Sequence, residues 1–501
     1  MSAAAIQLDP RRISGEISPL VYSGFTEHMG RCIYDGIFEP NNSNGLVDEN
    51  GFRTDVLQAL KDCNTAAVRW PGGNFVQSYR WEDGVGPKES RPARLELAWL
   101  GVETNAFGTD EFMAWCDKLG AEPFICLNMG TGTLESALHW LEYMNGTQPT
   151  YWAEMRKKNG HPEPYKVKYI ALGNEVWGPW QVGQATAEDY AKAARQWGKA
   201  LKLVDPTIKL VSCGKEGTDN WDRIVLEECI DIIDYHSLHL YTRGPEHEVN
   251  AISPALAQKG IEITRSYIDL AMMHPDRRAA CAGKAKPGIC FDEWNVWNPD
   301  IAPGVSGAEQ EYTMSDALAV AAYLNVFIRT NTEIACLAQS VNVISPLMTS
   351  PTGLLKQPTF FPLQLFATYM RGKNLSIYVD TPKYEGTMGS DRPWVKDICA
   401  DSLGWIDATA ALDGNTLNIA IINRHPQEAF EVELNLAGSR KVVGEMEVHE
   451  LHHENLMAVN TWEDSEQVVP TKSSAPFTGS YTAKAGSLSV VRLNLSNENM
   501  S

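Results

Sequence analysis

The chain lacks the features that mark membrane proteins and disulfide-bonded proteins. None of its apolar runs reaches the roughly 20 residues that a membrane-spanning helix needs. Its ten cysteines are scattered, form no CxxC pair, and include Cys126, Cys290 and Cys336 inside apolar segments, where a thiol packs as a small hydrophobic side chain. Residues 1–12 do not read as a secretory signal. We therefore expect a cytoplasmic protein without disulfides.

Basic residues, phosphate loops and metal-binding patterns are also scarce. The net charge of −20 repels nucleic acid and anionic membranes, so we expect neither as a partner. Pro71-Gly72-Gly73 lacks the lysine and spacing of a phosphate loop, and we expect no cofactor. His236 and His239 are three apart on a predicted strand and point to opposite faces, while His452-His453 lies among acidic residues. We expect no metal site.

What is present is a regular alternation of short apolar runs and helix-like stretches. With 501 residues, 44% of them hydrophobic, the chain favours one large domain with a smaller companion. Helical periodicity marks residues 187–203 and 316–327. Eight such pairs predict a closed (β/α)8 TIM barrel, with an open doubly wound sheet as the alternative. The predicted strands cover residues 20–27, 65–70, 123–129, 169–175, 208–213, 232–241, 288–294 and 334–344.

The period changes beyond about residue 385. Residues 430–436 and 487–495 alternate apolar and polar side chains, and Asp413-Gly414 is a hairpin-turn signal between two further apolar runs. These patterns predict a C-terminal antiparallel β-sandwich. We place the barrel at residues 18–385 and the sandwich at residues 386–501, joined by the N-terminal residues 1–17.

Polar residues stand where the predicted barrel strands end. Because parallel strands in such a barrel end at one rim, these side chains should meet there. For any one of them, capping a helix or facing water is the alternative. A glutamate after a buried strand is costly unless it is paired or used. The rim residues are Glu27, Arg69, Asn174, Glu175, His239, Tyr241, Glu293 and Gln339.

Glu175 and Glu293 fit the cleavage of a glycosidic bond. One carboxyl group must protonate the leaving oxygen while the other attacks the sugar carbon, and in retaining enzymes the two lie roughly 5 Å apart. We assign Glu175, next to Asn174, as the acid/base and Glu293 as the nucleophile. Once Glu293 forms an ester its charge vanishes, and Glu175 can then activate water.

Several longer motifs resemble glycoside hydrolase family 51, the α-L-arabinofuranosidases, from about residue 18 to the C-terminus. The motifs are FTEHMGR (25–31), RWPGGNF (69–75), WEDGVGP (81–87), GNE (173–175), GPWQ (178–181), FDEWNVW (291–297) and AQSVNV (338–343). The resemblance implies a retaining mechanism and a hexamer. It also implies a furanose pocket formed by Glu27, Arg69, Asn74, Asn174, Tyr241 and Gln339.

Tryptophans near these motifs are candidate platforms for sugar rings, with core packing as the alternative. We favour substrate contact for Trp99 and Trp177, and packing for Trp180. Trp294 is a further candidate platform, and Trp297 joins His239 in a supporting role. Where the family often has Met-Asp after Gly-Asn-Glu, this chain has Val176-Trp177, a bulky ring on the leaving-group side.

The prediction is therefore an exo-acting retaining α-L-arabinofuranosidase that trims short arabinoxylan or arabinan oligosaccharides. A β-D-galactofuranosidase or a β-1,4-glucan-cleaving enzyme would use the same two glutamates and stays open. A non-catalytic carbohydrate-binding protein is the third alternative, although such a protein would be expected to lack one of the carboxylates.

Overall fold

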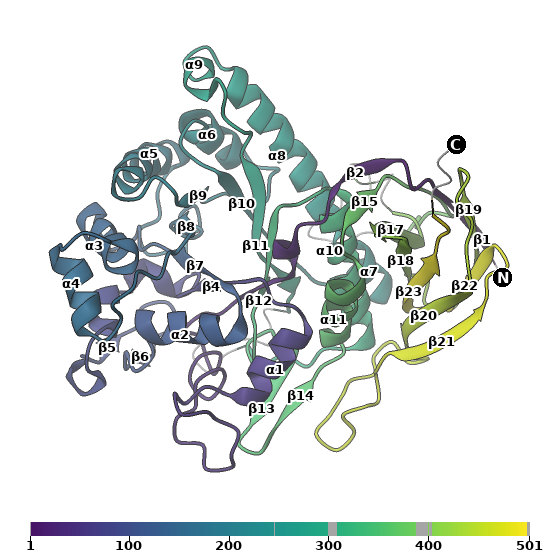
Figure 1. Cartoon of the computed structure of the whole chain (residues 1–501), viewed down its shortest axis with the longest axis horizontal. Helices are drawn as coiled ribbons and strands as arrows, with labels where there is room; N and C mark the ends of the chain where they lie inside the picture. Colours follow the sequence, from purple (N-terminus) through teal and green to yellow (C-terminus); the bar gives the residue numbers. More distant parts are fainter. Residues whose placement is uncertain (1, 245, 299–307, 387–398, 400–402, 498–501) are drawn as a thin grey trace.

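Eight parallel strands close into a barrel at the centre of the molecule. The computed structural model describes residues 2–244, 246–298, 308–386, 399 and 403–497 (Figure 1). The barrel strands pair in chain order, and the last pairs with the first, which confirms the predicted barrel and makes the open-sheet alternative wrong. They are β3 (Ser23–Phe25), β4 (Ala67–Trp70), β7 (Glu122–Cys126), β8 (Tyr169–Leu172), β9 (Lys209–Ser212), β10 (Tyr235–Thr242), β11 (Gly288–Val296) and β12 (Ile334–Ala338).

The strands read as continuous apolar runs because both of their faces are covered. Every residue of β4, β8, β11 and β12 is buried, as expected for parallel strands between a packed interior and a layer of helices. The predicted strand over residues 334–344 ends earlier, at Ala338. The residues after it leave the sheet and include Gln339 and Ile344, which line a cavity at the rim.

Helices cover the outside of the barrel. Both helices predicted from periodicity are confirmed as α5 (Ala187–Val204) and α10 (Met314–Arg329), and threonine side chains cap both N-termini. The other helices are α1 (Thr54–Asp62), α2 (Thr109–Leu119), α3 (Leu134–Asn145), α4 (Tyr151–Lys158), α6 (Asn220–Cys229), α7 (His247–Ile252), α8 (Ala255–Met273), α9 (Arg278–Cys281) and α11 (Phe360–Tyr369).

Two antiparallel hairpins extend the barrel loops. The first pairs β5 (Arg94–Leu95) with β6 (Val102–Glu103) and follows barrel strand β4 in the chain. The second pairs β13 (Leu347–Ser350) with β14 (Gly353–Lys356). Single-turn 3-10 helices lie at Pro19–Tyr22, Phe75–Ser78, Trp81–Gly84 and Lys88–Ser90.

A β-sandwich packs beside the barrel, as predicted. The predicted Asp413-Gly414 turn joins β17 to β18, with Asp413 paired to Thr416. The larger sheet runs β2 (Ile13–Glu16), β15 (Lys373–Leu375), β17 (Ile406–Asp413), β18 (Thr416–Asn423), β23 (Ser487–Asn494), β20 (Glu445–His452) and β21 (Thr471–Pro476). The smaller runs β16 (Tyr378–Asp380), β1 (Ser2–Leu8), β19 (Phe430–Leu436) and β22 (Ser480–Ala483).

The N-terminal strands belong to the sandwich sheets: β1 pairs in parallel with β19, and β2 pairs with β15. The predicted division of the chain at residues 385 and 386 stays a prediction. Two strands of the sandwich sheets, β15 and β16, come before it in the chain, and residues 387–398 lie outside the described part.

Helix α10 connects the barrel to the sandwich and is buried over nearly its whole length. Its Asn325 amide donates to Asp407 (3.0 Å) and accepts from Thr409 (2.6 Å), both on β17. Arg329 of the same helix pairs with Asp407. The sandwich is thus fixed to the barrel by a polar cluster inside an apolar contact.

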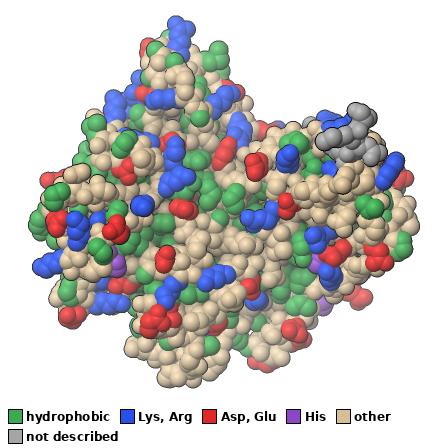
Figure 2. All heavy atoms as spheres, in the orientation of Figure 1, with side chains coloured by type: hydrophobic (Ala, Val, Ile, Leu, Met, Phe, Trp, Pro, Cys, Tyr) green, Lys and Arg blue, Asp and Glu red, His purple; other side chains and the backbone are tan. Residues whose placement is uncertain are grey.

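The charged side chains on the surface are of mixed sign. On the face shown in Figure 2, basic and acidic side chains are interspersed, and neither sign forms a continuous patch. Among the described residues, no helix combines the length and apolar character that crossing a bilayer requires.

Candidate active site

A bulge in β11 brings two consecutive carboxylates to the barrel rim. Between Phe291 and Trp294, β11 has one residue more than its neighbour β12, and such a bulge re-aims side chains locally. Asp292 and Glu293 therefore both reach the same guanidinium, that of Arg69 on β4.

Arg69 organises the floor of the site. It is 1% exposed and donates through Nη1 to Glu293 Oε1 and through Nη2 to Asn174 Oδ1, each at 2.7 Å. Its Nε lies 3.2 Å from Asp292 Oδ2. Burial alone would lower the pKa of Arg69, but Asp292 and Glu293 raise it well above its ordinary value. A buried cation with two carboxylate partners can be retained at modest cost.

Glu175 follows β8 in an unusual backbone conformation. Its φ is +43°, a region that costs about 1 kcal/mol or more for a residue other than glycine. Two buried amides, Gln77 and Gln181, each donate to the preceding Asn174 carbonyl oxygen at 2.8 Å. These two bonds fix the peptide plane that leads into Glu175 and so offset the strain.

His239 on β10 links the acidic groups. Its Nδ1 lies 3.0 Å from Glu175 Oε1 and 3.6 Å from Glu293 Oε2, and its Nε2 lies 3.2 Å from Asp292 Oδ1. Burial alone would lower the pKa of His239, but Glu293, Asp292 and Glu175 together raise it to about 10. The imidazole is therefore a cation at neutral pH.

Oxygens of Glu175 and Glu293 and a ring nitrogen of His239 all lie within 4.8 Å of one another. Such spacing would also suit a divalent cation. However, the guanidinium of Arg69 and the protonated His239 already supply positive charge beside these carboxylates, which disfavours a second cation. The absence of a metal site stays a prediction.

Glu27 follows strand β3 and lines another side of the site. Its Oε1 accepts from the Phe75 backbone N–H (2.9 Å) and from Trp99 Nε1 (3.2 Å). Gln339 donates to the other carboxylate oxygen at 3.3 Å. Burial, assisted by Glu293, raises the pKa of Glu27 to about 8, so this carboxyl group is mostly protonated at neutral pH.

Three further polar groups face the same region. The Tyr241 hydroxyl donates to Glu293 Oε2 at 2.9 Å. Asn174 Nδ2 and Asn74 Oδ1 are buried and have no hydrogen-bond partner among the described residues. Such atoms are costly unless a ligand or water completes them. A side chain at Gly73 would meet Glu293 at 2.8 Å, so glycine there keeps this space open.

A cavity of about 550 Å³ opens above these groups. Ten of the twelve residues assigned from the sequence line it, and the other two, Arg69 and Asn174, bond to Glu293 or to each other beneath it. The ten are Glu27, Asn74, Trp99, Glu175, Trp177, His239, Tyr241, Glu293, Trp297 and Gln339.

Two tryptophan predictions differ from the structure. Trp180, expected to pack internally, is 58% exposed at the cavity edge and lies edge-on to Trp177. Its ring is exposed because Pro179 and Trp180 form the outer part of this turn, whereas the flanking Gly178 and Gln181 are buried. Trp294, a candidate platform, is fully buried against Tyr323 and Phe327, because the side chain after Glu293 turns to the helical layer.

Three residues of this network are not found by sequence reasoning: Asp292, Gln77 and Gln181. Asp292 adjoins Glu293, but on a regular strand it would point away from the site. Gln181 belongs to a quoted motif without a polar role assigned. Gln77 carries no sequence signal, because its partners lie 97 residues away at Asn174 and 52 residues away at Met129.

A barrel rim with two carboxyl groups held this close, beneath a cavity lined by polar side chains and by tryptophans, is what a glycoside hydrolase requires. The predicted enzyme class agrees with the following comparisons.

The family model for the α-L-arabinofuranosidase 1 domain matches residues 59–252, and that for the α-L-arabinofuranosidase C-terminal domain matches residues 292–489. The "Probable alpha-L-arabinofuranosidase C" of Aspergillus niger is 50% identical and covers 94% of this chain and 96% of its own. The crystal structure of an α-L-arabinofuranosidase from Thermotoga maritima, in an arabinose complex, is 36% identical. It has a TM-score of 0.88, and the match covers 98% of this chain and 100% of that one.

A third relative, from Halalkalibacterium halodurans, is named "Intracellular exo-alpha-(1->5)-L-arabinofuranosidase". It is 37% identical over 96% of each chain. The chain belongs to glycoside hydrolase family 51, the α-L-arabinofuranosidases.

Proposed function

We propose that this arabinofuranosidase is a retaining exo-enzyme that removes terminal α-L-arabinofuranosyl groups from arabinoxylan and arabinan oligosaccharides. The observation that carries the proposal is the approach of Glu175 and Glu293 oxygens to within 4.8 Å. Retaining glycosidases separate their carboxyl groups by about 5–5.5 Å, whereas inverting enzymes leave roughly 6.5–9.5 Å for a water molecule.

In the first step, Glu175 gives its proton to the leaving glycosidic oxygen while Glu293 attacks the anomeric carbon. Arg69 and Tyr241 hold the two Glu293 oxygens, at 2.7 and 2.9 Å, and so fix the direction of attack. Asn174 Nδ2, which has no hydrogen-bond partner among the described residues and lies beside Gly73, would bind the sugar 2-hydroxyl, an interaction that strengthens in the transition state.

In the second step, Glu175 takes a proton from water, which attacks the glycosyl ester and releases arabinose with its original anomeric configuration. Esterified Glu293 no longer carries a charge, so Glu175 is left as the base facing the sugar. His239 Nδ1 lies 3.0 Å from Glu175 Oε1, and this contact fixes the position of the carboxyl group beside the sugar.

The proposed substrate is supported by the shape of the cavity, and the proposed cytoplasmic setting is supported by a relative. Asn74, Glu27 and Gln339 close one end of the cavity, which suits a terminal sugar. The relative named as an intracellular exo-enzyme supports a cytoplasmic setting, in which short oligosaccharides rather than polymers would be met.

The stereochemistry of hydrolysis tests the mechanism. Proton NMR of the first sugar released from a nitrophenyl α-L-arabinofuranoside should show the α-anomer before mutarotation. A β-anomer as first product would contradict the roles given to Glu175 and Glu293. A panel that includes galactofuranoside and β-glucoside substrates should favour the arabinofuranoside, and binding without any release would indicate a carbohydrate-binding protein instead.

Family membership further supports a homo-oligomer, which we propose to be a hexamer. Light scattering coupled to size exclusion should give six times the chain mass of 55.5 kDa. A monomer mass would contradict it.

A further inference from the structure

Two smaller cavities continue from the catalytic cavity across the same face of the barrel. The first, of about 270 Å³, shares Leu97 of the β5–β6 hairpin with the catalytic cavity. The second, of about 330 Å³, shares Tyr79, Arg80, Asp83 and Thr131 with the first. We call the two together the distal groove; its walls are residues 79–83, 94–97 and 128–136.

The loops that line the distal groove and the catalytic cavity are also in contact with each other. A side chain at Gly130 would lie 2.7 Å from the Val182 carbonyl oxygen, so the two loops are in direct contact there. Val182 lines the catalytic cavity, and Thr131 lines the distal groove. A chain-like ligand that leaves the catalytic cavity therefore meets a continuous wall.

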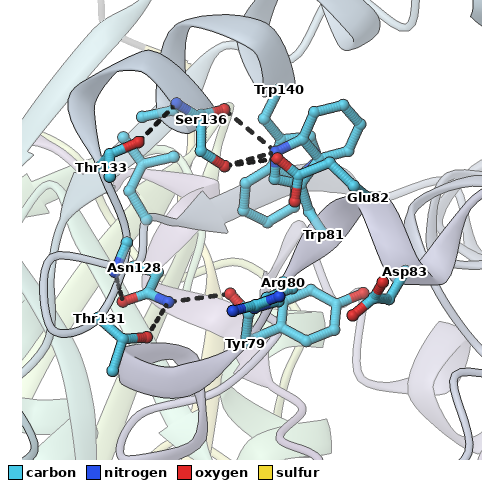
Figure 3. Close-up of a pocket in the computed structure, with 13 residues that line it drawn as sticks. Tyr79, Arg80, Trp81, Glu82, Asp83, Asn128, Thr131, Thr133, Ser136 and Trp140 are labelled. Atoms are coloured by element: carbon cyan, nitrogen blue, oxygen red, sulfur yellow. Dashed lines mark hydrogen bonds between the residues drawn. The ribbon is translucent and has the colours of Figure 1, made fainter. Parts of the chain in front are cut away.

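Polar side chains face one another across the groove (Figure 3). Arg80, Asn128 and Thr131 stand on one side, and Glu82, Thr133 and Ser136 on the other. Arg80 is exposed, and its side chain makes no hydrogen bond or ion pair with any residue in the described ranges. Its guanidinium donors remain free for a ligand.

The walls are held in place by bonds of their own. Asn128 donates to the Tyr79 carbonyl oxygen (2.9 Å) and accepts from the Gly130 and Gly132 N–H groups (3.0 Å each). Glu82 accepts from the Ser136 hydroxyl at 2.7 Å. A preformed polar surface loses little entropy when it binds a ligand.

The charges indicate a neutral polyhydroxyl ligand. The distal groove is lined by Arg80 and Arg94 and by four acidic residues, Glu82, Asp83, Glu96 and Glu103. Asp83 is already paired with Arg94, and the excess of carboxylates disfavours an anion. Sugar hydroxyls both donate and accept, and they suit a mixture of guanidinium, carboxylate and hydroxyl groups. Exposed Leu95 and Leu97 offer apolar contact for the carbon faces of sugar rings.

We propose that the distal groove binds the part of an oligosaccharide substrate that lies several sugar units from the cleaved bond, with Arg80 as a binding residue. This inference rests on the proposed function. It means that the enzyme recognises the chain carrying the arabinosyl group as well as that group.

The test compares substrates of different length. For the wild type, kcat/KM should rise from nitrophenyl arabinofuranoside through arabinofuranosyl-substituted oligosaccharides of two to five sugars. Arg80→Ala should lower kcat/KM for the longest substrate by about tenfold, the effect of losing one hydrogen bond to a charged group. It should change the value for the nitrophenyl substrate less than twofold.

Arg278→Ala is the matched control, because Arg278 is also exposed but lies on α9, far from the hairpin in Figure 1. It should leave both substrates unchanged. A second measurement uses the inactive Glu293→Ala variant: calorimetric affinity should grow with chain length, and adding Arg80→Ala should remove most of that growth.

Equal effects of Arg80→Ala on short and long substrates, or affinity independent of length, would overturn the distal groove alone. If the wild type releases no arabinose from the nitrophenyl substrate, the proposed function fails first. The two failures are therefore distinguishable.

Discussion

At the scale of single residues, the site is a balance of buried charges. Arg69 and protonated His239 face Asp292 and Glu293, while Glu27 is kept largely neutral by burial. Each ionised carboxylate thus has a cationic partner, which is the condition for burying it. The catalytic groups depend on this balance as much as on their own positions.

Because His239 is charged in the fold, we expect the free energy of unfolding to depend on pH. The pKa of His239 in the fold, about 10, lies above its ordinary value of 6.5, so protonation stabilises the fold. This contribution is complete below pH 6.5 and is lost as the pH rises through 10. The free energy of unfolding of the wild type, measured with urea, should exceed that of His239→Gln most at pH 6. This difference in free energy should narrow by up to about 1.4 kcal/mol per pH unit above 6.5.

Tyr241→Phe is the control for this experiment. Burial raises the pKa of Tyr241 well above its ordinary value, so that its hydroxyl does not ionise in the window. The stability gap between wild type and Tyr241→Phe should stay constant from pH 6 to 9. A constant gap for His239→Gln as well would show that the imidazole is not charged.

The two amides that hold the Asn174 carbonyl make a second prediction. Gln77→Leu or Gln181→Leu removes one donor from this oxygen, so the Glu175 backbone can relax from its strained φ. Proton donation should suffer most. We expect kcat to fall about tenfold for an oligosaccharide and less for a nitrophenyl substrate, whose leaving group needs little protonation.

Gln184→Leu is the matched control, because Gln184 is exposed and its amide donates weakly, at 3.4 Å, to the Trp177 carbonyl oxygen and not to that of Asn174. It should behave as wild type with both substrates. If Gln77→Leu lowers kcat equally for good and poor leaving groups, the glutamine does not act through Glu175.

At the scale of elements, loops and irregularities shape the site. The bulge in β11 aims Asp292 and Glu293 at one cation. The β5–β6 hairpin carries Trp99 over Glu27. Glu103 anchors the base of this hairpin. Its carboxylate accepts hydrogen bonds from the Asn105 N–H (2.6 Å) and from the Tyr34 hydroxyl, and it lies 2.8 Å from His28 Nδ1.

Loosening this hairpin should weaken substrate binding. Glu103→Gln removes the charge that His28 and Tyr34 contact, so Trp99 should be held less firmly above the sugar. We expect KM for nitrophenyl arabinofuranoside to rise about tenfold while kcat changes less than threefold, because the catalytic pair is untouched. The exposed Glu89→Gln, in the same loop, should change neither value. A fall in kcat alone would contradict the anchoring role.

Sequence patterns predict the regular elements better than these irregular ones. The eight barrel strands are visible because burial on both faces demands continuous apolar runs, and α5 and α10 because their apolar residues repeat with helical spacing. Strands such as β21, exposed throughout, have no such pattern. The β11 bulge and the Gln77 bonds depend on contacts between distant segments, and local sequence does not encode them.

At the scale of the whole molecule, the sandwich is attached to the barrel through α10 and β17. Asp407 joins Arg329 and Asn325 across this contact. Asp407→Ala leaves the Asn325 amide without its acceptor and the Arg329 guanidinium without its carboxylate partner, although Arg329 still donates to Gln258 and to the Ala408 carbonyl oxygen. We expect the free energy of unfolding to fall by about 2 kcal/mol.

Urea unfolding followed by tryptophan fluorescence and by circular dichroism should still coincide in one transition for this variant. Glu433→Ala, exposed on β19 of the sandwich, should have little effect. No loss of stability on replacing Asp407 would mean that the apolar contact alone attaches the sandwich.

In the proposed mechanism, Glu293 forms a covalent bond to arabinose, and Glu175 activates the water that cleaves it. The most direct test incubates Glu175→Ala with a dinitrophenyl arabinofuranoside, whose leaving group needs no acid, and maps the labelled peptide by mass spectrometry. We expect an arabinosyl ester to accumulate on Glu293 and to disappear when azide is added. A label on another residue, or turnover with no covalent intermediate and an inverted product, would contradict it.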